Sequence, residues 1–292
     1  MPLDQDHEHE RLKKDRGEMS FFEHITELRR HILRSVLAIF AVGTICFLNK
    51  EFVFEKVIFG PRHPDFPTFR ILCNLSHTVG AGEQMCFTPP KFDLITRVLG
   101  EVLMQHLYVS FWLGFIGAFP FIFWEFWKFV QPGLLETEQK AIRGVVFICS
   151  FLFLLGVAFG YYVIAPFSIS FLAGYTMEGV VVSPTLDSYV TYMTMFTLPT
   201  GLIFEMPVIA YFLAKTGLIG ARFLRTYRRH AVVIILIVAA IITPPDVVSQ
   251  TLVAIPLYML YEISILVVAR VQRKQELALL REESGVITRS EK

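Results

Sequence analysis

Charged residues are scarce in this sequence. Only 18% of its 292 residues are Asp, Glu, Lys or Arg, whereas a soluble domain has about 25%. Hydrophobic residues make up 54% of the chain. This composition excludes an ordinary soluble domain and indicates a protein whose solvent is the lipid bilayer. The 28 Phe residues are not interleaved with basic side chains, so we predict no nucleic-acid partner.

The motifs of the common enzyme classes are missing as well. The sequence contains no Walker loop, no HExxH, no GxSxG and no dinucleotide fingerprint. Several of the eight His residues lie in the N-terminal segment or in predicted loops, and His106 and His230 lie near predicted helix ends. We therefore predict that the protein is not an enzyme and has no cofactor and no metal site.

No cleavable signal peptide is evident either. The first 20 residues are polar and charged, the first apolar run begins near Ile32, and no small-residue cleavage site follows that run. We therefore expect the first apolar segment to remain in the protein as a transmembrane helix. Ser20 and Glu23 fit a capping box, which predicts that a helix begins at about Phe21.

Long apolar stretches are what the sequence has in abundance. Six are free or nearly free of charge, at 35–48, 102–124, 145–172, 189–214, 231–242 and 247–269. They predict an all-α, polytopic membrane protein with six transmembrane helices. The fifth stretch is short: even with His230 and Thr243 added, it reaches roughly 21 Å, whereas a hydrocarbon core is about 30 Å thick. We expect one transmembrane domain at 21–272, an N-terminal tail at 1–20 and a C-terminal tail at 273–292.

The positions of Lys and Arg predict the orientation in the membrane. These residues cluster before the first span, after the last span and in the second and fourth connections. The positive-inside rule places such clusters in the cytoplasm. Since an even number of spans leaves both termini on one side, we predict cytoplasmic N and C termini, and a bacterial cytoplasmic (inner) membrane as the default location.

The four cysteines fall into two pairs. Cys46 and Cys149 lie within apolar stretches, whereas Cys73 and Cys86 lie in the first external loop. If that loop faces an oxidising compartment, a disulfide between Cys73 and Cys86 would make it more rigid. Because the spacing does not give the geometry, both cysteines could also be free.

Glu205 is the sharpest polar signal within an apolar stretch. An acidic residue at the centre of a transmembrane helix costs about 2.5 to 3.5 kcal/mol on insertion scales, so such residues usually face protein or water and mark a function. Glu205 could instead be a structural carboxyl group that is hydrogen-bonded inside the bundle next to the kink expected at Pro207.

Two predicted cytoplasmic segments carry the other notable acids. Glu27 lies in the segment 24–30, and Glu138 follows the Pro-Gly turn of the segment 129–140. An acid in the first turn of a helix is already stabilised by the helix dipole, and a basic flank before the first span needs no further role. Alternatively, carboxylates from two such segments could together hold a pair of guanidinium groups.

Four motifs give the sequence a family resemblance from about residue 21 to residue 270. They are HITELR at 24–29, FVQPGLLETE at 129–138, FEMP at 204–207, and TPPDVVSQ at 243–250 followed by AIP at 254–256. Together they resemble the TatC family, the multi-spanning receptor subunit of the twin-arginine protein translocase.

The resemblance implies a cup-shaped six-helix bundle that binds twin-arginine signal peptides and recruits single-span TatA- and TatB-type subunits to export folded proteins with the proton motive force. It also implies self-association in a larger complex within the lipid bilayer. The residues that match the family's motifs are Glu27, Arg29, Phe129 and Glu138 for signal-peptide binding, Glu205 for an intramembrane contact, and Thr243 and Gln250 for docking of a partner helix.

The sequence departs from the family pattern in two places. Gln139 and Lys140 stand where a pair of basic residues is common, and the first external loop is longer, which leaves the match of Pro61 to the family's first-loop proline unsettled. The alternative function is a proton-coupled secondary transporter with Glu205 as the proton carrier. A transporter is disfavoured because Glu262 is the only other acid that the sequence places clearly within a span.

Overall fold

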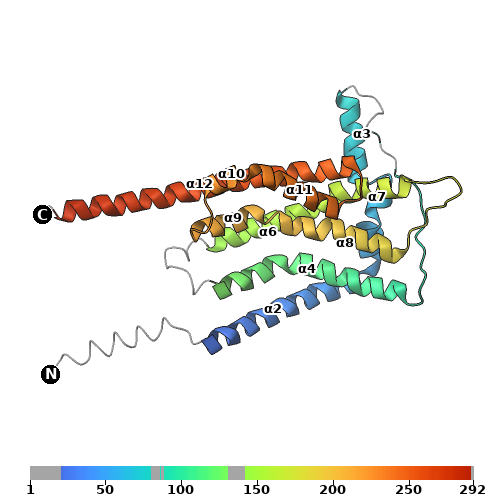
Figure 1. Cartoon of the computed structure of the whole chain (residues 1–292). Helices are drawn as coiled ribbons and strands as arrows, with labels where there is room; N and C mark the ends of the chain where they lie inside the picture. Colours follow the sequence, from blue (N-terminus) through green and yellow to red (C-terminus); the bar gives the residue numbers. More distant parts are fainter. Residues whose placement is uncertain (1–20, 80–85, 87–88, 131–141, 291–292) are drawn as a thin grey trace.

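The computed structural model describes residues 21–79, 86, 89–130 and 142–290, and the long helices of this part of the chain run side by side (Figure 1). The first half contains α2 (Phe21–Leu48), the π-helical turn η1 (Phe52–Ile58), the short 3-10 turn η2 (Gly60–Arg62), α3 (Pro67–Val79) and α4 (Glu101–Val130). The chain is helical from Phe21, the first described residue, and the capping box stays a prediction because Ser20 lies outside the described residues.

The second half contains two spans that are each built from consecutive helical pieces. The third span comprises α6 (Ile142–Phe159), the π-helical turn η4 (Gly160–Ile164) and α7 (Ala165–Gly174), and the fourth comprises α8 (Leu186–Ile203) and α9 (Met206–Lys215). The chain continues through α10 (Ala221–Thr226), α11 (Arg228–Ile242) and α12 (Val247–Ser290). The described residues form no β-strand, apart from one isolated bridge between Ile95 and Thr185.

Five helices of the described chain are long and apolar enough to cross a membrane. They cover His24–Leu48, Glu101–Val130, Gly144–Gly174, Leu186–Lys215 and Ser249–Leu277. The predicted fifth span corresponds to α11, whose 15 residues reach about 23 Å. The shortness expected from the sequence is therefore present. Helix α12 continues to Ser290, within the predicted C-terminal tail.

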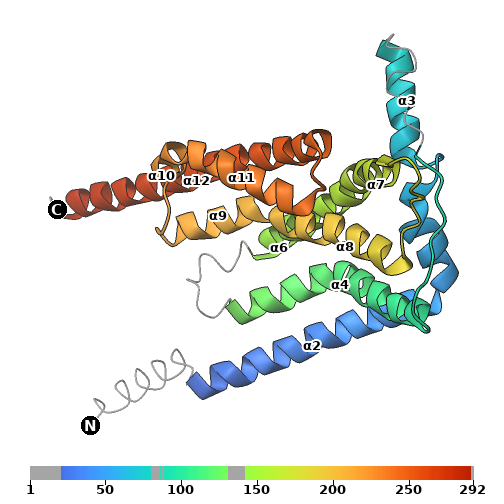
Figure 2. The same ribbon diagram turned by 45° about the vertical axis from the view of Figure 1, so that its right-hand side comes forward.

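The first residues of α2 and the last turns of α12 lie at the same end of the bundle in both views (Figures 1 and 2). We call this the terminal end, and the opposite end the loop end. At the loop end, Leu186 donates its backbone N–H to the carbonyl of Ile95, and Ile95 donates to the carbonyl of Pro184. These bonds tie the long first loop to the connection before α8.

Glycines allow the closest helix packing. At Gly114 of α4, an added Cβ would lie 2.7 Å from the backbone oxygen of Ile39 and 2.9 Å from the Cα of Gly43, both on α2. Only glycine permits this approach, which is how helices pack tightly where lipid removes the hydrophobic drive between them. The core between the later helices is filled by large buried side chains, including Phe153, Phe196, Leu257 and Ile265.

Pro207 explains the break between α8 and α9. Proline has no N–H to donate to the preceding turn, so a helix is interrupted or bent there. Here the interruption falls at Phe204 and Glu205, and the carbonyl of Glu205 accepts the N–H groups of Val208 and Ile209 to start the next helix. The kink predicted from the sequence is therefore present, and Glu205 lies at it.

Candidate functional site

Aromatic and imidazole rings join α2 to α4 at the terminal end. The ring of His24 stacks on the ring of Phe129, with 4.4 Å between centroids, and His31 meets Phe129 edge-on at 6.3 Å. Glu27 lies three residues after His24 and four before His31, so these three side chains share one face of α2. Glu27 is half-buried and Arg29 is exposed. Two of the predicted site residues, Glu27 and Phe129, are thus placed at one junction, and Glu138 lies outside the described residues.

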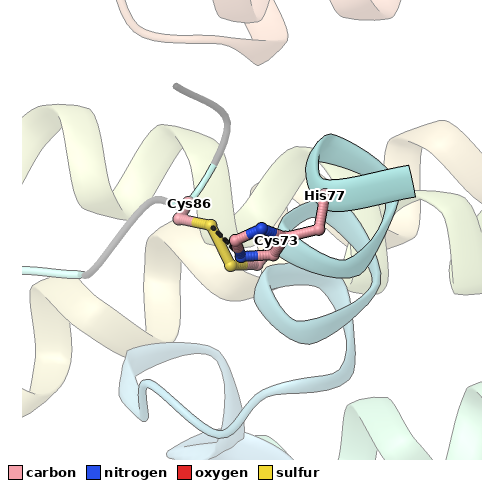
Figure 3. The surroundings of a disulfide bond; sticks show 3 residues. All are labelled: Cys73, His77 and Cys86. Atoms are coloured by element: carbon pink, nitrogen blue, oxygen red, sulfur yellow. Dashed lines mark hydrogen bonds between the residues drawn. A yellow bond between two sulfur atoms is a disulfide. The ribbon is translucent and has the colours of Figure 1, made fainter. Parts of the chain in front are cut away.

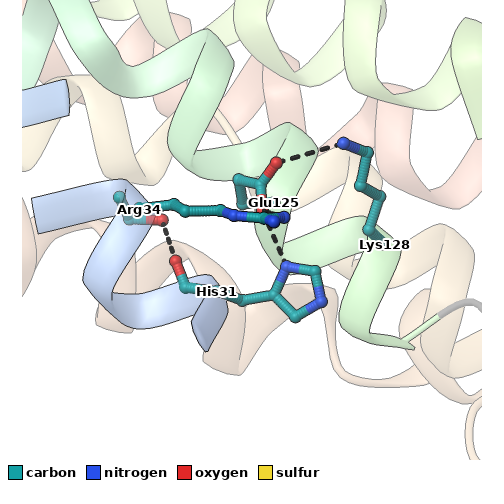
Figure 4. A network of polar contacts seen from close by, with 5 residues as sticks. His31, Arg34, Glu125 and Lys128 are labelled. Atoms are coloured by element: carbon teal, nitrogen blue, oxygen red, sulfur yellow. Dashed lines mark hydrogen bonds and ion pairs between the residues drawn. The ribbon is translucent and has the colours of Figure 1, made fainter. Parts of the chain in front are cut away.

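A buried acid supports this junction from within the bundle (Figure 4). Glu125 of α4 is only 2% exposed. Its Oε2 atom lies 2.7 Å from Nδ1 of His31 and 3.5 Å from a guanidinium nitrogen of Arg34, and Nζ of Lys128 donates to Oε1 at 3.1 Å. A buried carboxylate costs several kcal/mol unless charged hydrogen-bond donors surround it, and here three basic side chains do so.

Sequence reasoning missed Glu125. The predicted second apolar stretch ends at Trp124, and Glu262 is predicted to be the only acid besides Glu205 that lies clearly within a span. The helix in fact continues to Val130, so that expectation was wrong. The available signal was a lone acid within the aromatic run 123–127, with basic residues at helical spacing on the neighbouring segment.

Glu205 has different surroundings. It lies in the fourth span at the break between α8 and α9 and is 7% exposed. Its Oε1 atom is buried and finds no hydrogen-bond partner among the described residues. The carboxyl group interacts with the thiol of Cys149 and with the backbone of Phe153, both on α6. A buried polar atom left without a partner is unfavourable in a membrane bundle, so Glu205 has the capacity to accept a group from outside the chain.

Thr243 and Gln250 lie where α11 turns into α12. The hydroxyl of Thr243 donates to the carbonyl of Ala239 at 2.8 Å, and the side-chain amide of Gln250 donates to the carbonyl of Leu236 at 3.2 Å. Both side chains therefore fasten the end of α11. Beside them, α11 and α12 form an apolar groove of about 780 Å³ whose lining includes Leu236, Ile255 and Met259.

The loop-end cysteines are joined in the structure. Cys73 of α3 and Cys86 form a disulfide, and Nε2 of His77 lies 3.9 Å from the sulfur of Cys86 (Figure 3). The three side chains lie close enough together to resemble a metal-ligand set. Disulfide sulfurs are not thiolates, however, and metal ions are bound by thiolates, so in this state only the imidazole remains as a ligand. The arrangement is a covalent brace for α3.

Residues 23–256 match the model of a protein family described as the Sec-independent protein translocase protein (TatC). The chain belongs to the TatC family. Its relatives include the TatC protein of Blattabacterium sp. subsp. Periplaneta americana, which is 38% identical over 90% of this chain and 100% of its own length. That of Desulforapulum autotrophicum is 34% identical over 87% of this chain and 86% of its own.

The fold agrees with this assignment. A crystal structure of the twin-arginine translocase receptor TatC in detergent superposes with a TM-score of 0.64 and 32% sequence identity, covering 84% of this chain and 98% of that one. As a TatC protein the chain is a multi-pass membrane component of a protein translocase, and it is not an enzyme. The family assignment decides against the alternative of a small-solute transporter.

Proposed function

We propose that the chain is the signal-peptide receptor of a twin-arginine translocase, with the terminal end of its bundle in the cytoplasm of a bacterium and its spans in the inner membrane. In this proposal Glu27 and Glu138 hold the guanidinium groups of the paired arginines, because two carboxylates can each form bidentate hydrogen bonds with a guanidinium group. Phe129 and Arg29 complete the site.

The stack of His24 on Phe129 carries this proposal. It fixes the HITELR segment of α2 against the end of α4, from which the segment containing Glu138 continues. Glu27 is half-buried and shares the face of α2 on which His24 and His31 contact Phe129. A peptide that approaches this junction meets an aromatic ring and a carboxylate at the same place.

The proposal extends to the partners. The apolar groove between α11 and α12 suits a single apolar helix of a TatA- or TatB-type subunit, with Thr243 and Gln250 at its loop-end edge. Glu205 does not line this groove. At the break between α8 and α9 it would meet a polar group on a partner's helix, which would supply the hydrogen bond that Oε1 lacks. Export of folded proteins would draw on the proton motive force, and several copies would assemble into one complex.

Peptide binding to the detergent-purified protein tests the receptor role. A peptide with paired arginines should bind wild type at least tenfold more tightly than Glu27→Ala or Glu138→Ala, since a hydrogen-bonded charge pair contributes about 1.5 to 3 kcal/mol. The matched control is Glu178→Ala, which removes an exposed acid from the connection between α7 and α8. A twin-lysine peptide should bind weakly to all four proteins, because Lys lacks the bidentate fork.

Equal binding of the twin-arginine peptide by wild type, Glu27→Ala and Glu138→Ala would overturn the two-acid site. A variant that elutes from size exclusion like wild type but does not bind separates a lost contact from a lost fold.

A further inference from the structure

Helix α3 is the element of the loop end that the proposed function does not use. It stands across the direction of the long helices in both views and extends outward from the bundle (Figures 1 and 2). If the long helices cross a membrane, α3 therefore lies parallel to the membrane plane. A helix in that orientation either rests in water above the bilayer or lies within its surface.

The first turn of α3 is attached to the third span, at a point well before the loop-end terminus of that span. The hydroxyl of Thr68 donates to the backbone carbonyl of Tyr162, and the ring of Phe66 stacks on the ring of Tyr162 with 5.5 Å between centroids. Phe66 and Phe69 are buried, at 6% and 3% exposure. These contacts give α3 a defined depth.

That depth is within the bilayer. Tyr162 precedes Gly174, the last residue of the span, by twelve residues, or about 18 Å along a helix axis. The span has 31 residues and is about 46 Å long, so it exceeds a hydrocarbon core of about 30 Å by roughly 16 Å in total. With that excess shared between the two ends, the carbonyl of Tyr162 lies roughly 10 Å inside the hydrocarbon core. The first turn of α3 is therefore attached below the headgroups and not in the water beyond the span.

The sides of α3 are chemically distinct. Ile71 and Leu75, one helical turn apart, are 66% and 51% exposed. Arg70, Asn74 and His77 are also spaced by one turn and are exposed, but on another side of the helix. This is the pattern of a helix that lies in a membrane interface, with one side in the acyl region and the other among headgroups.

We propose that α3 is an interfacial membrane helix whose Ile71 and Leu75 side chains contact lipid acyl chains of the loop-end leaflet, while Arg70, Asn74 and His77 face headgroups and water. The disulfide between Cys73 and Cys86 braces the helix from its polar side, and the contacts with Tyr162 hold its first turn. Together they prevent the helix from rotating its apolar side into water. The lipid-facing surface of the protein thus continues from the spans onto the first loop.

Depth-dependent fluorescence quenching tests this inference. A genetically encoded fluorescent amino acid is placed at Leu75 or, as the matched control one residue away, at Asn74, and each protein is reconstituted in vesicles of phosphatidylcholine with or without bromine on the acyl chains. All four cysteines stay in place. A probe at Leu37, which is 64% exposed on α2, is the reference for a lipid-facing position.

At Leu75 we expect the brominated lipid to lower the fluorescence at least about twofold, as at Leu37, and aqueous iodide to have little effect, because an apolar interfacial side lies below the headgroups. At Asn74 iodide should be the stronger quencher. Iodide quenching at Leu75 as strong as at Asn74 would overturn the inference, since α3 would then lie in water. Protection of Leu75 from both quenchers would also overturn it, because protein, such as a second copy of the chain, would then cover this side. No signal peptide is present, so the result is independent of the proposed receptor role.

Discussion

Glu125 and Glu205 are both acids buried in the spans, but their surroundings are opposite. Glu125 is contacted by His31, Arg34 and Lys128, whereas Oε1 of Glu205 has no hydrogen-bond partner among the described residues. A fully partnered buried acid holds helices in place, and an acid with unused hydrogen-bonding capacity is suited to meet a group from another molecule. The same residue type is thus held by three basic side chains at the terminal end and left with an unpartnered oxygen inside the bundle.

Replacing Glu125 should have the largest effect on stability. Glu125→Gln removes the negative charge and leaves three basic side chains around a neutral amide, which should lower the free energy of unfolding by about 3 kcal/mol. Thermal unfolding in detergent measures this, with Glu178→Gln as the control for removal of an exposed acid. An unfolding midpoint equal to that of the control would show that the network does not hold α2 to α4.

Replacing Glu205 should give the reverse pattern. Glu205→Gln replaces a buried carboxyl group whose Oε1 has no partner among the described residues, so the unfolding midpoint should stay at or above that of wild type. Export of a folded reporter in cells that lack their own TatC should fall about tenfold, equivalent to about 1.4 kcal/mol, if the carboxylate binds a partner's polar group. Loss of stability together with normal export would make Glu205 a structural residue, like Glu125.

The sequence located the long helices well because unbroken apolar runs are what a bilayer requires. The start of α4 falls within one residue of its prediction, but its end was placed six residues early. The predicted span ends just before Glu125 because this residue is charged. Basic residues on α2, however, make the burial of Glu125 tolerable. Such pairing depends on which helices become neighbours, and a single sequence does not reveal that.

The sequence was less informative at the loop end. Helix α3 lies in the segment predicted only as the first external loop. Its 13 residues are too few for a span, and its orientation is set by contacts with Tyr162. Cys73 and Cys86 were recognised as a candidate pair, but only the fold brings their Cα atoms to 4.4 Å. The kink beside Glu205 was predictable because Pro207 has no backbone N–H to donate. Its sharpness was not, since Pro120, Pro199 and Pro256 lie inside uninterrupted helices.

Lys128 should contribute less to the stability of the Glu125 network than His31 does. Its side chain is 43% exposed, whereas that of His31 is 16% exposed, so water already screens its interaction with Glu125. Lys128→Met should therefore lower the free energy of unfolding by at most about 1 kcal/mol. The same unfolding assay measures it, and the double variant with Glu125→Gln gives the coupling between the two residues. A cost as large as that of Glu125→Gln would mean that Lys128, not His31, is the main partner.

Asp65 and Arg70 form the same kind of pair without burial, and they should show the smallest effect. The guanidinium of Arg70 lies 2.9 Å from Asp65 and lowers the pKa of that carboxyl below its usual range, first by hydrogen bonding and then by its charge. A carboxyl group whose pKa is lowered by folding adds stability at pH values above its usual pKa. This stability is lost as the pH falls through the folded-state pKa. Both side chains are largely exposed, however, and solvent and salt screen such pairs.

The unfolding midpoint of Asp65→Asn should therefore match that of wild type at neutral pH, in low and in high salt. A clear, salt-sensitive loss would show that an exposed pair can fix α3 as firmly as a buried network fixes α2, and burial would then not explain the difference between these acids.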